Sequence, residues 1–254
     1  AELEKGKISY RVKGNGAPLF FLHGLNGSSK SWIQQFCAFG DQYRVIAWDA
    51  PGYIESDVVS PDVDTYADVA RDLLDHLDVG DAMIIGHSMG GVVAGRFAHR
   101  HKDKTSRLVL SCSHYGNAEP PNTPLAEKYS RRIDELQSMT RADYGQLRAS
   151  KILPPSTQAH VKDAIAEMAS DARQDGLRAA GTMVQNADNR SALSTLQMPC
   201  LIISADCDTV VPPSRTQTLL DAIPNAAHVE LRGLGHAPYL EDPSAFNTAI
   251  QQFA

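Results

Sequence analysis

The sequence lacks the features that mark several special classes of protein. It has no run of about 18 apolar residues, which a membrane-spanning helix requires. It has no excess of basic residues either, since 24 Lys and Arg stand against 30 Asp and Glu and give a formal net charge of −6. Because nucleic-acid phosphates are bound by clustered positive charge, we expect a small-molecule substrate and neither a nucleic acid nor a membrane as partner.

Cysteine is also scarce. The four cysteines form no Cys-x-x-Cys pair, and no histidine stands near them at the spacing of a zinc site. A chain of 254 residues can bury about three-quarters of its unfolded surface, so it needs neither disulfides nor a metal to fold. We therefore expect a globular protein with no metal and no cofactor.

The N-terminal segment lacks a signal-peptide pattern. Residues Ala1–Lys5 show neither a basic n-region nor the start of an apolar h-region, so we expect a cytoplasmic protein. A mature chain from which a leader had been removed would begin in the same way. The sequence leaves the oligomeric state open between monomer and homodimer.

Short apolar runs alternate with helical periods over most of the chain. Strands are expected at residues 8–12, 18–22, 43–48, 82–85, 107–112, 200–204 and 228–231. Helices are expected at residues 31–39, 65–77 (with Asp64 as N-cap), 89–101, 214–222 and 243–253. Strands rich in Val, Ile and Leu that alternate with helices predict an α/β fold with a mostly parallel sheet and helices on both faces.

Residues 113–196 have a different pattern. A Pro-rich stretch at 119–124 marks a boundary, and only helical periods follow it, one of them with Ser156 as the expected N-cap. This interval predicts an all-helical cap inserted between two strands. The predicted organisation is a core domain formed by residues 1–112 and 197–254, with the cap at 113–196.

The strongest chemical signal is the pentapeptide Gly86–Gly90, which reads Gly-His-Ser-Met-Gly. It follows the apolar run 83–85 directly and opens a predicted helix, so it has the strand–turn–helix context of a nucleophilic serine. The flanking glycines permit a turn tight enough to expose Ser88, and the helix N-terminus favours a developing oxyanion. We therefore predict that Ser88 is a nucleophile.

A serine nucleophile needs a base, and the base needs an orienting carboxylate. One late strand runs into Asp206-Cys207-Asp208, and the next ends before His236. The carboxyl ends of parallel strands meet at one edge of the sheet, so an acid and a histidine should converge there. We predict His236 as the base, and at this point either aspartate can be the acid.

In chain order, these motifs resemble those of the α/β-hydrolase superfamily, and the likeness covers nearly all of the chain outside 113–196. The matching segments are His23-Gly24, Asp49–Gly52, Gly86–Gly91, Asp208 with Pro212, and Gly235–Pro243. The resemblance implies the α/β-hydrolase fold and selects Asp208 as the acid, with Ala205 where relatives carry glycine.

The oxyanion hole needs two backbone N–H groups. One is expected from Met89, the residue after the nucleophile. The resemblance implies Leu25 as the source of the second and a loop-pinning role for His23. One departure is Ile54, which stands where many relatives have glycine. A β-branched residue disfavours the positive φ that such a glycine would adopt.

Substrate contacts are the least specific part of the prediction. Positions after strands or on cap helices give candidate pocket residues Trp32, Tyr115, Tyr144, Met183 and Tyr239, each of which could equally be core. Two cap arginines, Arg173 and Arg190, could meet a substrate carboxylate, although exposed arginines are mostly solvated.

These features predict a serine hydrolase that cleaves a small carboxylic ester or lactone through an acyl-enzyme intermediate. Residues 176–188 resemble the cap of bacterial enol-lactone hydrolases. One alternative is a C–C bond hydrolase of meta-cleavage products, but such enzymes usually carry Trp after the histidine, where this chain has Ala237. The other is a receptor or binding protein of the same fold with low turnover.

Overall fold

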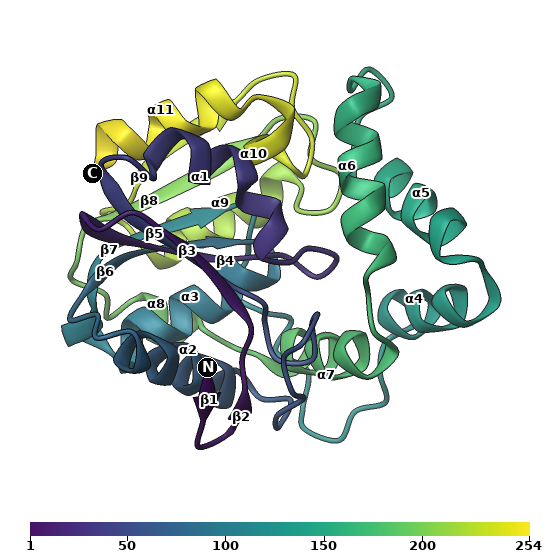
Figure 1. The fold of residues 1–254 in the computed structure, drawn as a ribbon, viewed down its shortest axis with the longest axis horizontal. Coiled ribbons are helices and arrows are strands. Elements are labelled where there is room, and N and C mark those ends of the chain that lie inside the picture. Colours follow the sequence, from purple (N-terminus) through teal and green to yellow (C-terminus); the bar gives the residue numbers. More distant parts are fainter.

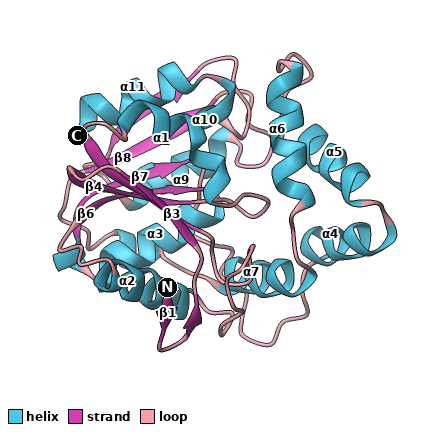
Figure 2. Cartoon of the chain, viewed as in Figure 1, coloured by secondary structure: helices cyan, strands magenta, loops and turns pink.

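The structure, a computed structural model, describes residues 1–254. Its central sheet has seven strands in the spatial order β3-β5-β4-β6-β7-β8-β9 (Figures 1 and 2). The strands are β3 (Tyr10–Lys13), β4 (Ala17–Leu22), β5 (Tyr43–Trp48), β6 (Ala82–His87), β7 (Thr105–Ser111), β8 (Cys200–Ala205) and β9 (Ala227–Leu231). β3 pairs antiparallel with β5, and all other neighbours pair parallel, which confirms the predicted sheet.

Some short elements were not predicted, and the first of them lies at the N-terminus. A hairpin of β1 (Glu2–Leu3) and β2 (Gly6–Lys7) precedes the sheet and forms a separate two-stranded sheet. Strands of two residues carry no readable alternation, so periodicity could not have found them.

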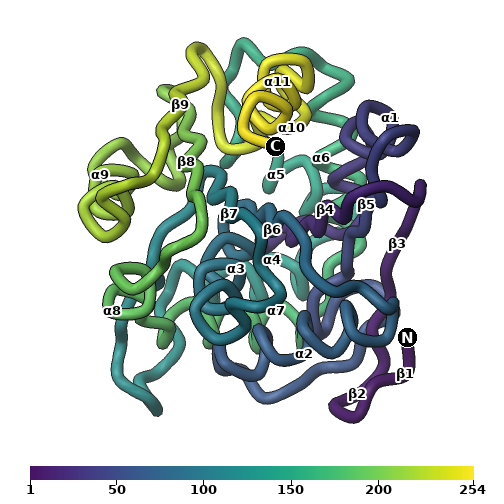
Figure 3. Tube along the Cα trace, turned by 90° about the vertical axis from the view of Figure 1, so that its left-hand side faces the viewer, coloured from purple at the N-terminus to yellow at the C-terminus, as the bar shows by residue number.

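Helices cover both faces of the sheet, as Figure 3 shows from the side. One face carries α1 (Ile33–Phe39), which follows the 3-10 turn η1 (Ser29–Trp32), together with α10 (Pro238–Glu241) and α11 (Pro243–Phe253). The other carries α2 (Val63–His76), α3 (Met89–Arg100), α8 (Arg190–Leu193) and α9 (Pro213–Ala222), with the 3-10 turn η2 (Lys102–Lys104) after α3. No helix reaches the length and apolar character needed to traverse a bilayer.

The two-sided covering follows from the strand sequences. In β4, Leu19 and Phe21 belong to the apolar cluster under α1 and α11, whereas Phe20 and Leu22 belong to the cluster on the α2 and α3 side. Successive side chains of a strand point to opposite faces, so a strand that is apolar at every position requires cover on both.

Two predicted helix starts are wrong by a few residues. Helix α2 begins at Val63 rather than at Thr65. Its N-cap is Asp62 rather than Asp64, because the side chain of Asp62 accepts the Thr65 amide. In the insertion, Ser156 is not the cap either, since α6 begins at Ala159 after Gln158. Two aspartates two positions apart offer the same capping chemistry, so the sequence alone does not separate them.

The insertion between β7 and β8 is helical, as predicted. It contains α4 (Glu127–Ser138), α5 (Arg141–Ile152), α6 (Ala159–Ser170) and α7 (Gln174–Asn186), which stand together beside the carboxyl edge of the sheet (Figure 1). Residues of α4 and α7 join the apolar cluster of one face of the sheet, and residues of α5 and α6 join that of the other. The cap therefore contributes to the apolar core on both faces of the sheet. The short helix α8 lies against α3 rather than among the cap helices.

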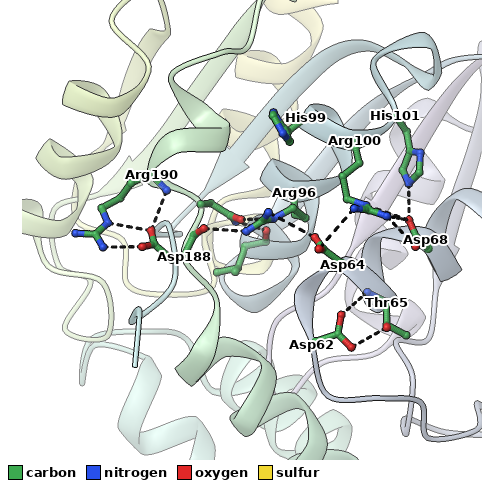
Figure 4. Close-up of polar contacts among 12 residues, drawn as sticks. Asp62, Asp64, Thr65, Asp68, Arg96, His99, Arg100, His101, Asp188 and Arg190 are labelled. Carbon is green, nitrogen blue, oxygen red and sulfur yellow. Dashed lines mark hydrogen bonds and ion pairs between the residues drawn. The ribbon is translucent and has the colours of Figure 1, made fainter. Parts of the chain in front are cut away.

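Hydrogen bonds fasten the cap to the helix that begins after Ser88. Arg96 of α3 donates to the side-chain oxygen of Asn189 and to the carbonyl of Asp188, both at 2.8 Å (Figure 4). The side-chain amide nitrogen of Asn189 donates in turn to the Val92 carbonyl at 2.7 Å. Arg190 forms an ion pair with Asp188 at 2.6 Å, so its guanidinium is engaged at the surface.

Candidate active site

Ser88 lies at the turn between β6 and α3 with φ 52° and ψ −117°, a conformation that is strained for a residue other than glycine. A Cβ on Gly86 would collide with the carbonyl of Gly90, and a Cβ on Gly90 would collide with that of Leu22. Only glycine fits at either position. The turn leaves Ser88 partly exposed while His87 and Met89 beside it are buried.

The structure brings Ser88, His236 and Asp208 together. The Nε2 atom of His236 lies 3.0 Å from Ser88 Oγ, and its Nδ1 atom lies 2.8 Å from Asp208 Oδ2. A protonated Nδ1 that donates to the carboxylate leaves Nε2 free to accept the serine proton. The three groups come from the ends of β6, β8 and β9, the edge where the sequence analysis placed them.

Asp208 is held as a buried carboxylate. Its Oδ1 atom accepts the amides of Val210 and Val211 at 2.8 and 2.9 Å. Burial raises the pKa of Asp208, but His236 and these two amides outweigh burial and bring the pKa below its ordinary value. The competing acid, Asp206, is exposed and accepts the Gly233 amide instead.

Glu241 holds the loop that carries His236, and sequence reasoning gave it no role. Its carboxylate accepts the amides of Gly235 and Ala237 at 3.0 Å, one on each side of His236, and the Thr157 hydroxyl at 3.2 Å. Burial raises the pKa of Glu241 in spite of these donors. The residue lies within the motif 235–243, but only the three-dimensional path of the loop reveals its contacts.

His87 supports the same loop from beneath. Its Nε2 donates to the His236 carbonyl at 2.6 Å. Burial, followed by the nearby His236, lowers the pKa of His87 to about 3, so its ring is neutral.

Leu25 and Met89 line the cavity above Ser88, and neither backbone N–H donates to another group of the chain. Tyr53 donates to the Leu25 carbonyl at 2.7 Å and fixes that loop. His23 holds the loop from the other side, since Nδ1 lies 2.8 Å from the Gly24 carbonyl and Nε2 accepts the Ala50 amide at 2.9 Å. The arrangement leaves two donors free for an oxyanion.

The cavity above Ser88 has a volume of about 130 Å³ and is lined from both core and cap. Of the five predicted pocket side chains, only Tyr239 lines it. The other four are corrected to packing positions: Trp32, Tyr115, Tyr144 and Met183.

Each of those four side chains has another place. Trp32 packs between the tilted rings of Phe21 and Tyr239, whose centroids lie 4.8 and 4.9 Å from its own. Met183 is wholly buried in the core, and Tyr144 is wholly buried with its hydroxyl 3.3 Å from Asn26 Oδ1. Tyr115 packs under the guanidinium of Arg190 at 5.7 Å.

Ile54 stands where many relatives have glycine, and the structure shows which backbone conformation it adopts. Ile54 adopts φ 50°, so the loop keeps the left-handed conformation that glycine would take more easily. Arg173 supports this loop by donating to the carbonyls of Ser56 at 2.8 Å and Ile54 at 3.3 Å. Arg173 is therefore committed to the loop rather than free for a substrate.

Among the cavity residues that were not predicted, four have basic side chains. They are His114, Lys128, Arg132 and Arg215. On α4, the apolar stripe indicates which side of the helix is buried, but Lys128 and Arg132 flank that stripe and could have pointed to either side.

One cluster has metal-ligand chemistry. Donor atoms of Cys112, Asp208 and His236 lie within 4.8 Å of one another. Burial and the neighbouring Asp208 raise the pKa of the Cys112 thiol, which disfavours the thiolate that binds metals. Asp208 and His236 already bond to each other, so the cluster is explained by the Ser–His–Asp arrangement.

Comparison with known proteins assigns the family. The alpha/beta hydrolase fold family matches residues 17–243. A pimeloyl-acyl-carrier protein methyl ester esterase from Vibrio cholerae is 27% identical over 260 residues, covering 97% of this chain and 98% of that protein. A thermophilic esterase from Thermogutta terrifontis is 26% identical with a TM-score of 0.85, covering 97% of this chain and 92% of that one.

The enol-lactonase from Burkholderia xenovorans LB400 is similar in fold, with a TM-score of 0.89 at 22% identity, over 100% of this chain and 98% of that one. These proteins are hydrolases by name, and the two esterases match this chain over nearly its whole length. The chain belongs to the α/β-hydrolase fold family.

Proposed function

We propose that the protein is a serine hydrolase that cleaves a small carboxylic ester or lactone through an acyl-enzyme intermediate. The observation that carries the proposal is the hydrogen-bonded series from Asp208 through His236 to Ser88. The free amides of Leu25 and Met89 beside it supply the place for a developing negative charge.

In the first half-reaction, Ser88 Oγ attacks the substrate carbonyl while His236 Nε2 takes the hydroxyl proton. The carbonyl oxygen becomes an oxyanion that accepts the N–H groups of Leu25 and Met89. When the tetrahedral intermediate collapses, the bond to the alcohol oxygen breaks and His236 returns the proton to that oxygen. An ester releases an alcohol, and a lactone keeps its alcohol tethered to the acyl group.

In the second half-reaction, water replaces the alcohol. His236 takes a proton from water as its oxygen attacks the acyl carbon, and the second tetrahedral intermediate releases the carboxylic acid and restores Ser88. Asp208 stays ionised throughout and stabilises the histidinium that forms twice per cycle.

The cavity supports a small acyl group. Its volume of about 130 Å³ is close to the roughly 150 Å³ of an apolar cavity that accommodates benzene. The methyl ester esterase from Vibrio cholerae supports ester chemistry at this site by similarity.

The test is steady-state hydrolysis of a panel of short-chain esters and lactones by the wild-type protein and by Ser88→Ala. We expect turnover by the wild type that falls as the acyl chain lengthens beyond the cavity, and a loss of at least about 10³-fold in the variant. Equal rates for the two proteins, or no turnover of any ester or lactone by the wild type, would contradict the proposal.

A further inference from the structure

The cavity above Ser88 carries an unbalanced positive charge. Lys128 and Arg132 of α4 and Arg215 of α9 all line it, and no aspartate or glutamate does. Asp208, the acid of the Ser–His–Asp series, is bonded to the side of His236 away from Ser88. The chain as a whole has a formal net charge of −6, so this local excess is opposite to its general composition.

None of the three cations has a carboxylate partner. Arg132 takes part in no hydrogen bond or ion pair in the structure, and Lys128 has only the ring of Tyr129, 4.9 Å from its ammonium. Arg215 donates to the neutral side-chain oxygen of Asn117 at 2.7 Å. Other cap arginines do have a carboxylate partner, as Arg148 has in Glu135 at 2.6 Å and Arg173 in Asp175 at 2.7 Å.

The sequence of α4 sets Lys128 and Arg132 four positions apart, where like charges on a helix repel each other. The neighbouring Arg131 has acids on both sides, Glu127 and Glu135, at 3.7 and 4.0 Å. The exposed face of α4 is thus neutralised, and the face toward the cavity is not.

Burial and a like charge make the positive charge of Arg132 costly. Burial and the nearby Arg148 lower the pKa of Arg132, although an arginine keeps its proton at neutral pH. An anion placed beside Arg132 would relieve both effects and occupy its unused donors.

We propose that the substrate bears a second, unreacting carboxylate in addition to its ester or lactone carbonyl, and that Arg132 binds this carboxylate. Lys128 and Arg215 add positive charge to the same wall. A guanidinium presents parallel N–H groups that match the two oxygens of a carboxylate, which gives orientation as well as affinity. The inference rests on the proposed hydrolase function, because it assigns the carbonyl end of the same molecule to Ser88.

The test compares monomethyl esters of succinic, glutaric and adipic acid with the same methyl esters in which a carboxamide replaces the free carboxylate. In the wild type, we expect kcat/KM to be at least 10-fold higher for the best charged ester than for its amide. In Arg132→Gln, kcat/KM for the charged ester should fall roughly 10- to 100-fold, mainly through KM, while the amide changes less than about 3-fold.

Two variants complete the design. Arg132→Lys keeps the charge without the paired N–H groups and should retain part of the preference. Arg131→Gln, on the outer face of the same helix, should leave both substrates unaffected. Equal turnover of charged and neutral esters by the wild type, or an equal loss for both in Arg132→Gln, would overturn the inference while leaving the hydrolase function standing.

A binding arm separates the two proposals. In the Ser88→Ala protein, glutarate should raise the melting temperature in a concentration-dependent manner, and adding Arg132→Gln should abolish that rise. If the wild type hydrolyses no ester, the proposed function fails and this arm alone decides the inference. No rise in melting temperature with succinate, glutarate or adipate, or an equal rise in both proteins, would overturn the inference.

Discussion

Glu241 should control both the stability of the protein and the position of its histidine. Its carboxylate accepts the amides on either side of His236 and the Thr157 hydroxyl. Glu241→Ala removes the partner of all three donors, at about 1 kcal/mol each, so unfolding free energy should fall by about 3 kcal/mol. In Glu241→Gln the remaining oxygen can still accept both amides, because Oε1 alone lies 3.0 Å from each nitrogen, so this variant should lose mainly the Thr157 contact, about 1 kcal/mol.

Glu241→Ala should also lower kcat by a larger factor than it raises KM. A displacement of about 1 Å in a catalytic group costs about 100-fold in rate, and the loop of His236 loses its support on both sides. Urea unfolding and steady-state kinetics would measure the two effects, with Glu230→Ala, an exposed acid on β9, as the matched control. Wild-type kcat in a folded Glu241→Ala protein would show that Glu241 does not position His236.

Glu241 also predicts a pH effect of defined sign. Its pKa is raised in the folded protein, chiefly by burial, so folding favours its protonated form. Relative to Glu241→Gln, the wild type should therefore lose stability as the pH rises from about 4 toward 7. Urea unfolding of both proteins across this range would measure it, and a difference that is constant or grows in favour of the wild type would contradict it.

Three further predictions follow from the geometry. In Gly24→Ala, the new Cβ would lie 2.8 Å from His87 Nδ1, so the oxyanion loop must shift, and kcat should fall about 100-fold; an unchanged kcat would contradict this. Ile54→Gly should raise unfolding free energy or leave it within about 1 kcal/mol, because the strain of its positive φ offsets the entropy of glycine; a loss above about 2 kcal/mol would be inconsistent. The pKa of Asp208 is lowered in the folded protein, so its stabilising effect is present above the ordinary pKa of aspartate and is lost as the pH falls through the lowered value. In urea unfolding, the stability advantage over Asp208→Asn should therefore shrink between about pH 5 and 2, and a constant advantage would contradict this.

The sheet and the Ser–His–Asp convergence could be predicted because they follow from local patterns. Each buried strand is a short run of Val, Ile, Leu or Phe, and parallel strands bring their carboxyl ends to one edge. That rule predicts that Ser88, His236 and one of the two aspartates, Asp206 or Asp208, lie within reach of one another. Separating Asp208 from Asp206 needed the family resemblance, because a shift of one or two residues at a strand end exchanges them.

The pocket could not be predicted in the same way. Trp32 and Met183 are apolar, and an apolar side chain suits a core and a pocket equally well. The cap helices are the second difficulty, since periodicity shows that α4 has a buried side but not which neighbour it faces. For that reason Arg132 gave no signal in the sequence, and Arg190 was considered for a substrate contact although it pairs with Asp188 at the surface.

The proposed mechanism requires Ser88 to carry the acyl group of the substrate. Mass spectrometry of protein quenched within milliseconds of mixing with an activated short-chain ester tests it most directly. We expect a mass increase of one acyl group on the peptide that contains Ser88, transient in the wild type and absent from Ser88→Ala. Rapid turnover with no acylated Ser88 at any time, or an acyl group carried on another residue in both proteins, would contradict it.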